Sequence, residues 1–517
     1  MRIYILLIAL GLVSCQPRVR APGSVQGNDL ASIIETFHRG AQEGVSSSED
    51  CHLRLTDVYN AIFHLTIDSS LALDLTKKEQ EDLIRKSFLT RLEIKEKLKQ
   101  LRIQNKMDTA CLGAVKDVVR AMRYVEDYMI EVFYPLAQIE DFETFKTPGI
   151  HFLINPKFEK TFKSHEDLKS GDIILSRGGA YSSAAIARIG THDTQFSHLI
   201  LIYKDPKTKK LQTVEAHIEV GSLTLQMQQV LDERHARAML FRYPDEAIAH
   251  QAAEIMFKRV RAAEQTGKRI PYDFSMDYHD GTTLFCSEII SEGFKKASKG
   301  KLDIPDHKTQ FNPRLLPFLQ LLGIKVNERN VDTFKTFAPG DMQFDSHFEV
   351  VAEFRNPAKL RDSREKDAIL TKIFEWMSEY KYSFRPPVGI QTKTMVSWIL
   401  RRTPIAQRFL EEKFPLNMSR DQLKLFLVLD DVGKVLQDHI AEVQLKLDLP
   451  LTPQEIYEIL EDFRKDDALR FKIYTQKNSE LSRLNQFDRE SRDHFQETRL
   501  RREIKANKPH FHQWFRD

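Results

Sequence analysis

One cysteine of this sequence is placed for nucleophilic chemistry. Cys286 follows a loop that contains Asp280, Gly281 and Thr282, and it opens an apolar-periodic stretch that predicts a helix to about residue 296. At a helix N-terminus, the backbone N–H groups and the helix dipole favour the nucleophilic thiolate and can also receive an oxyanion. The alternative for Cys286 is a buried structural cysteine, which is common for this residue type.

A cysteine nucleophile needs a base, and the base needs an orienting acceptor. His198 directly precedes the apolar run 199–203, a predicted strand that would hold its imidazole in one orientation. In the next predicted strand, the period of two places Glu215 and His217 on one face. Either residue could orient His198, and the pattern alone leaves both open.

Other chemistries lack their sequence signatures. There is no HExxH, paired CxxC or Gly-x-Ser-x-Gly pattern, and no Gly-rich phosphate loop. His192, His198, His217 and His279 match no metal-ligand spacing, so neither a metal nor another cofactor is expected. The net charge of +3 over 517 residues argues against a nucleic-acid partner.

The candidate residues fall in a region of mixed helices and strands, residues 150–360. Short β-branched or apolar runs bounded by turn residues predict strands, and longer stretches of 3.6-residue period predict helices. The expected strands are 172–175, 199–203, 211–216 and 350–354, and the expected helices are 182–189, 247–264 and 286–296. The fold class expected for this region is α+β.

Helical regions flank this domain on both sides. Residues 29–147 carry a capping box from Thr76 to Glu79 and apolar residues at helical spacing. Residues 363–517 form a charged helical region with a second capping box, from Thr452 to Glu455. Its last part, about 465–502, predicts a solvent-bridging helix or a partly disordered tail.

The first residues predict export. Residues 1–14 have one positive charge and a short apolar run, as in a signal peptide, and Leu12 to Cys15 resemble a bacterial lipobox. Lipid on Cys15 and a tether over 15–28 would anchor the protein on the periplasmic side of the bacterial cell envelope. Gln16 is similar to an outer-membrane sorting signal. In that oxidising compartment Cys51 and Cys111 could pair, which leaves Cys286 as the odd thiol.

An ordered series of short motifs resembles the circularly permuted NlpC/P60 hydrolases, specifically the YiiX/YebB-like group, over about residues 165–300. In this papain-like fold the histidine strand precedes the cysteine helix. The matching segments are 170–175, a serine-bearing helix start at Ser182 and Ser183, 196–198, 214–216, 271–274 and 285–288.

The resemblance implies that Cys286 attacks a carbonyl carbon, that His198 is the general base and acid, and that Glu215 orients the imidazole, with His217 as the alternative. It also implies substrate or oxyanion support from Tyr272 and Ser183. The expected activity is amide hydrolysis in peptidoglycan peptides. Two alternatives remain open: a lipid acyltransferase or thioesterase of the same fold, and a non-catalytic envelope scaffold.

Overall fold

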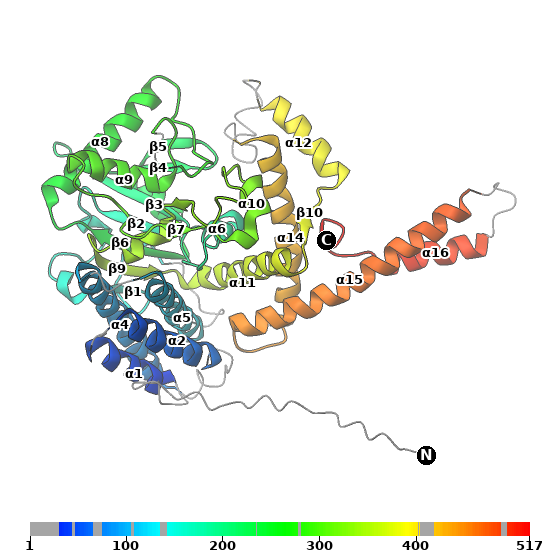
Figure 1. Cartoon of the computed structure of the whole chain (residues 1–517), viewed down its shortest axis with the longest axis horizontal. Coiled ribbons are helices and arrows are strands. Elements are labelled where there is room, and N and C mark those ends of the chain that lie inside the picture. The colour runs from blue at the N-terminus through cyan, green and yellow to red at the C-terminus, as the bar shows by residue number, and fades with distance from the viewer. Residues whose placement is uncertain are drawn as a thin grey trace, which may run out of the picture.

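A computed structural model describes residues 30–43, 47–65, 75–104, 108–134, 142–233, 235–277, 281–401, 403, 418–486 and 494–517. It has an antiparallel sheet with helices around it (Figure 1). The α+β class expected for the chain is therefore confirmed. Cys15, the signal peptide, the tether and His279 lie outside the described residues.

The central sheet has seven strands in the order β1-β9-β6-β2-β3-β4-β5. Its strands are β1 (Phe152–Ile154), β2 (Ile173–Arg177), β3 (His198–Lys204), β4 (Leu211–His217), β5 (Gly221–Gln226), β6 (Arg237–Arg242) and β9 (Glu349–Arg355). Two small ribbons pair β7 (Thr309–Gln310) with β8 (Lys335–Thr336), and β10 (Ser383–Phe384) with β11 (Phe515–Arg516). The sequence predicted β2, β3, β4 and β9 but missed β1, β5 and β6.

Both faces of the sheet are apolar, because successive side chains of a strand point to opposite faces. The main core takes one set of alternating residues, which includes Ile173, Leu175, Leu199, Leu201, Met239 and Phe241. The other set, which includes Ile174, Ile200, Ile202, Ala238 and Leu240, packs with α7 (Met227–Asp232) and with residues 142–168. With both faces covered, the central strands read as continuous apolar runs rather than as alternating ones.

Helices α8 (Glu246–Gln265) and α9 (Cys286–Ala297) pack against each other and against strands β3 and β4. Their close approach depends on Gly293. A Cβ at this position would lie 2.9 Å from Met256 Cγ and 3.1 Å from the carbonyl oxygen of Ala252. This contact fixes α9, which begins at Cys286, relative to the strand that begins at His198.

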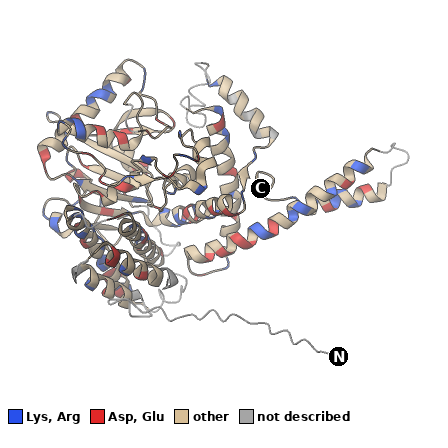
Figure 2. Ribbon diagram, in the orientation of Figure 1, with Lys and Arg blue, Asp and Glu red and all other residues tan. Residues whose placement is uncertain are grey.

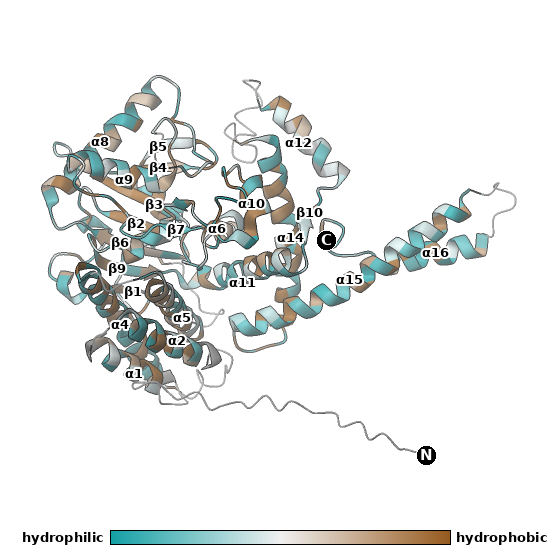
Figure 3. Cartoon of the chain, in the orientation of Figure 1, coloured by the Kyte–Doolittle hydropathy of each residue, from teal (hydrophilic) through white to brown (hydrophobic). Residues whose placement is uncertain are grey.

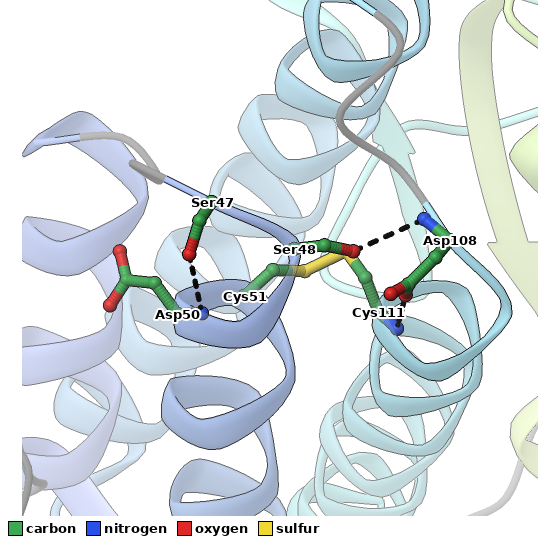
Figure 4. The surroundings of a disulfide bond; sticks show 6 residues. All are labelled: Ser47, Ser48, Asp50, Cys51, Asp108 and Cys111. Carbon is green, nitrogen blue, oxygen red and sulfur yellow. Dashed lines mark hydrogen bonds between the residues drawn. A yellow bond between two sulfur atoms is a disulfide. The ribbon is translucent and has the colours of Figure 1, made fainter.

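The N-terminal region consists of α1 (Leu30–Glu43), α2 (Ser48–Leu65), α4 (Lys77–Ile103) and α5 (Thr109–Phe133). Cys51 of α2 and Cys111 of α5 form a disulfide with a Cα–Cα distance of 5.4 Å (Figure 4). The expected capping box is present, since Thr76 Oγ1 accepts from the Glu79 N–H at 3.3 Å. These helices share the main apolar core with the sheet.

The C-terminal region surrounds a second core. Helices α6 (Tyr181–Ile186) and α10 (Leu316–Leu321) belong to the sheet domain and contribute to this core. The helices of the C-terminal region are α11 (Pro357–Glu379), α12 (Val388–Leu400), α14 (Arg420–Gln444), α15 (Pro453–Leu484) and α16 (His494–Ala506). Short 3-10 turns lie at Pro156–Phe158, His165–Asp167, Pro313–Leu315 and Pro339–Phe344. The boundary expected near residues 360–363 falls inside α11, so a continuous helix joins the two regions.

Helices α15 and α16 form a two-helix arm that extends away from the rest of the molecule (Figure 1). Charges of both signs alternate along it (Figure 2), and its exposed surface is mostly hydrophilic (Figure 3). The charged segment predicted at 465–502 is therefore largely helical where the structure describes it. Among the described residues, no helix is both long and apolar enough to cross a membrane.

Candidate active site

Two neighbouring strands bring together the predicted base and its orienting acceptor. His198 is the first residue of β3, and its Nε2 lies 2.9 Å from Oε2 of Glu215 on β4. The Glu215 side chain is fully buried, whereas that of His198 is 20% exposed. The carboxylate is therefore fixed in the protein interior, and the imidazole reaches from it toward the surface.

His217 binds the same carboxylate from a second direction. Its Nε2 lies 2.9 Å from Glu215 Oε2, and its ring meets the His198 ring edge to face at a centroid distance of 5.1 Å. Thr213, two residues before Glu215, donates its hydroxyl to Oε1 at 2.5 Å. Thus Glu215, and not His217, is the group that hydrogen-bonds His198.

Cys286 occupies the first turn of α9, where the sequence placed it. The Glu288 carboxylate accepts a hydrogen bond of 3.1 Å from the Phe285 N–H and so caps the helix. Cys286 is 3% exposed, and its side chain is close enough to His198 to raise the pKa of that imidazole. Because His198 Nε2 is engaged by Glu215, Nδ1 is the nitrogen left for the thiol.

The electrostatics of the three groups favour an ion pair. Burial by itself would lower the pKa of His198, but hydrogen bonds to Cys286 and Glu215 outweigh it and raise this pKa to about 10. Burial would raise the pKa of Glu215, yet the hydrogen bonds from His198 and His217 hold it well below its usual value. An imidazolium beside a carboxylate is therefore the stable state of the pair near neutral pH.

Tyr272 lies near Cys286. It forms an isolated parallel bridge with Leu284, two residues before Cys286, and its side chain is largely buried. Burial and the nearby Cys286 raise the pKa of Tyr272 well above its usual value, so its phenol stays a hydrogen-bond donor.

Ser183 lies at the edge of the site. Its hydroxyl faces Gly178, where a Cβ would be 2.9 Å from Ser183 Oγ. The Gly178 N–H in turn donates to Ser197 Oγ at 3.4 Å, and Ser197 directly precedes His198. Ser183 is thus connected to His198 only indirectly among these contacts, through Gly178 and Ser197.

Two further residues of this environment were missed from the sequence. Thr213 shares a strand face with Glu215, so the period-two pattern could have found it. His235 precedes β6, a strand that was not predicted, and nothing in the pattern pointed to it. His235 is 6% exposed, and burial together with the charge of His198 lowers its pKa to about 4. The His235 imidazole is therefore neutral near the charged imidazole of His198.

The donor set also has the chemistry of metal ligands. One ligand atom from each of His198, Glu215 and His217 lies within 4.8 Å of the others. Two imidazoles and a carboxylate suit zinc and similar ions. A metal bound here would occupy the nitrogen and oxygen atoms that orient His198, so metal binding and cysteine catalysis make different use of the same residues.

No protein-family model matches the sequence, and no curated protein matches it as a relative. Among solved structures, the crystal structure of the metalloprotein YiiX from Escherichia coli O157:H7, described as DUF1105, is similar to part of the chain. The two are 18% identical, and the match covers 35% of this chain and 96% of that chain with a TM-score of 0.27. A likeness this weak defines neither the fold nor the function.

Proposed function

We propose that the protein is a cysteine hydrolase that cleaves an amide bond, with Cys286 as nucleophile, His198 as general acid and base, and Glu215 as the residue that orients His198. One observation carries this proposal: His198 Nε2 lies 2.9 Å from the buried Glu215 carboxylate, and the Cys286 side chain is close enough to His198 to raise its pKa. A histidine strand that precedes a cysteine helix, on an antiparallel sheet, also supports a permuted papain-like arrangement.

In the first half of the reaction, the Cys286 thiolate attacks the substrate carbonyl carbon, and the carbonyl π electrons move onto oxygen. In this proposal the backbone N–H of Cys286, at a helix N-terminus, and the Tyr272 hydroxyl stabilise the oxyanion. His198 then gives its proton to the leaving amine as the carbon–nitrogen bond breaks. The product is a thioester on Cys286 and a free amine.

In the second half, water attacks the thioester while His198 takes its proton. The carbon–sulfur bond breaks, the carboxylic acid leaves, and Cys286 is regenerated. Glu215 keeps one imidazole nitrogen occupied through both halves, which holds His198 in the orientation and tautomer that serve the thiol.

The proposed substrate is an amide of peptidoglycan peptides. The signal peptide and the lipobox-like Cys15 would anchor the enzyme on the periplasmic side of the outer membrane. There it would face the periplasm, the compartment that contains peptidoglycan. The disulfide between Cys51 and Cys111 is consistent with an oxidising compartment.

A second candidate substrate is a lipid acyl group, and exposed apolar side chains near the site favour it. Met395, Val396, Ile399 and Leu400 of α12 are each 45–53% exposed. On its other side α12 packs on α14, and Trp398 shares a cluster with Ile218 and Phe274. Ile218 follows His217, and Phe274 follows Tyr272 by two positions. Ile218 and Phe274 therefore connect α12 to the segments that contain His217 and Tyr272.

Product analysis with Cys286→Ala tests the proposal. The full chain is incubated with purified peptidoglycan and, separately, with phospholipid vesicles, and products are identified by mass spectrometry. We expect peptide cleavage by the wild type and none by Cys286→Ala. Ser287→Ala is the matched control, because its buried hydroxyl has no hydrogen-bond partner among the described residues.

The outcomes separate the candidates. Undiminished cleavage by Cys286→Ala would remove Cys286 from the mechanism. Products from phospholipid alone would select the acyl substrate. Failure of iodoacetamide to label Cys286 near neutral pH, together with no products, would favour a non-catalytic scaffold. Activity that is lost on treatment with a chelator and restored by zinc would assign His198, Glu215 and His217 to a metal.

A further inference from the structure

A polar cavity of about 300 Å³ lies between the N-terminal helices and the sheet domain. Its walls are the C-terminal end of α4, the first turns of α5, residues 191–192, residues 303–310 and Lys335 of β8. Cys286, His198 and Glu215 do not line it. The cavity is therefore separate from the proposed active site, although one wall belongs to the loop that leads into His198.

Basic side chains dominate the lining. Four permanent cations and two histidines face two carboxylates, those of Asp303 and Asp306. The basic residues are Arg102, Lys116, His192, His307, Lys308 and Lys335. Arg102 pairs with Asp306, and Lys308 lies 3.3 Å from Asp303, so these four charges balance in pairs. The exposed Lys335 has no carboxylate partner among the described residues.

Lys116 is the buried base of this cavity. Its side chain is 7% exposed, and its Nζ lies 3.1 Å from Asp341 Oδ1. Asp341 is already engaged by Thr309, which donates its N–H at 2.9 Å and its hydroxyl at 2.7 Å. An ammonium group has three donors, and among the described residues Lys116 has one hydrogen bond, to Asp341, and a cation–π contact with the Phe344 ring at 5.7 Å. Donors left over on a buried ammonium make binding of an anion favourable.

His192 is held rigidly at the same cavity. Its Nδ1 donates to Asp117 Oδ1 at 3.2 Å, so Nε2 can donate to an anionic ligand when the ring is an imidazolium. The ring packs on the helix backbone at Gly113, where a Cβ would lie 3.0 Å from both Cε1 and Nε2. The absence of a side chain at position 113 is thus what lets the imidazole sit against α5.

We propose that this cavity binds a small molecule bearing phosphate, held by Lys116, His192 and Lys335. A compact anion would complete the donor set of the buried ammonium and neutralise the unpaired charge of Lys335. The volume is at the lower end of the range for small-molecule pockets, which favours a ligand no larger than a short phosphorylated compound. The ligand would join the N-terminal helices to the sheet domain, because its partners come from both.

Binding of pyrophosphate to the full chain tests this site. Isothermal titration calorimetry and thermal unfolding are measured with pyrophosphate against sodium chloride at equal ionic strength. We expect saturable binding and a melting temperature that rises with pyrophosphate. Lys335→Gln and His192→Gln should each weaken binding by about tenfold, the loss of one charge-assisted contact. Lys160→Gln, an exposed lysine that does not line the cavity, should bind as the wild type does.

Three results would overturn the proposal. They are the absence of saturable binding, equal binding by the wild type and both cavity variants, and a preference for citrate over pyrophosphate. The first two would show that no site exists at these residues, and the third would show a carboxylate site instead. Lys335 is exposed and His192 half-buried, so neither variant removes a core contact.

Discussion

His198 differs from an ordinary exposed histidine through its two partners. The thiol on one side and the carboxylate on the other stabilise its charged form and raise its pKa, in spite of burial. Glu215 is fully buried and accepts from His198, His217 and Thr213, so its charge is stabilised by fixed donors rather than by water. Orientation of His198 is therefore a property of these four residues together.

Glu215→Gln should lower the rate of hydrolysis strongly. An amide in place of the carboxylate can no longer stabilise the imidazolium, and it offers His198 a donor as well as an acceptor. By analogy with removal of the acid from a catalytic triad, the loss is expected to be about 10³–10⁴-fold. Single-turnover kinetics with the substrate that the wild type cleaves would measure this loss of rate. His217→Gln, which keeps Glu215 in place, should cost much less, and equal losses would contradict the role given to Glu215.

His151 is a buried histidine of a different kind. It stacks on Phe142 with a centroid distance of 3.9 Å, and its Nδ1 lies 3.2 Å from the Tyr134 hydroxyl. Burial lowers its pKa to about 4. The unfolded chain binds a proton at His151 near pH 6.5, whereas the folded chain does not. The contribution of His151 to the free energy of unfolding is therefore fully present above pH 6.5 and is lost as the pH falls toward 4.

Replacement of His151 by phenylalanine should therefore flatten the acid side of the stability profile. The free energy of unfolding of the wild type should fall by an additional amount on the order of 2 kcal/mol between pH 6.5 and 4. Urea unfolding at a series of pH values would measure both proteins. His494→Gln is the control, since this exposed histidine should leave the slope unchanged. Parallel profiles for wild type and His151→Phe would refute the assignment.

At the scale of elements, the disulfide joins two helices that are separated by most of the N-terminal region. Cys51 and Cys111 are 60 residues apart, and both sulfurs are buried in the core that α2 and α5 share. Local contacts support the junction, since Asp108 accepts from the Cys111 N–H at 2.8 Å and donates its own N–H to Ser48 (Figure 4).

The double variant Cys51→Ser/Cys111→Ser should destabilise the N-terminal helices. Closing a loop of this length restricts the unfolded chain by about 4 kcal/mol in the chain-entropy description. Thermal unfolding under oxidising conditions would show a lower midpoint than the wild type, and a reducing agent should lower the wild-type midpoint toward that of the variant. A reductant that lowers both midpoints equally would show that the disulfide is not the cause.

At the scale of the whole molecule, buried ion pairs hold the three regions together. Asp367 of α11 accepts from Arg177, Arg188 and Arg237 at 2.8–3.1 Å. Arg237 also binds Asp127 of α5 at 2.5 Å. The ionised groups extend from the N-terminal helices through the sheet to the C-terminal helices, and their side chains are almost fully buried.

Asp367→Asn should destabilise the whole fold rather than one region. It leaves Arg177 without a carboxylate partner among the described residues, whereas Arg188 and Arg237 keep Asp193 and Asp127. An unpaired buried charge costs about 3–5 kcal/mol. Chemical denaturation followed by far-UV circular dichroism would measure the loss. Asp466→Asn is the matched control, because its side chain is exposed and its one ion pair among the described residues is with Arg470 in the next turn. A similar loss in both variants would remove the special role of Asp367.

The sequence alone determined the α+β class, strands β2, β3, β4 and β9, and the helix that begins at Cys286. These depend on local periodicity, turn residues and capping patterns, which act within a few residues of the chain. It also placed Glu215 and His217 on one strand face. Strand β1 escaped prediction because it has only three residues, and β5 because it begins with Gly221 and Ser222, which are not typical of strands. Strand β6 carries Arg237 and Arg242 at its two ends.

Only the tertiary structure decided which residue orients His198 and which charges are buried. Glu215 and His217 were equivalent by periodicity, and strand pairing placed the carboxylate between the two imidazoles. His235 lies two residues before β6, and the pairing of β6 in the sheet brings it near His198. The sequence did not predict this strand. The buried arginine network joins residues more than 100 positions apart, such as Arg237 and Asp127, and no local pattern encodes a contact over that distance.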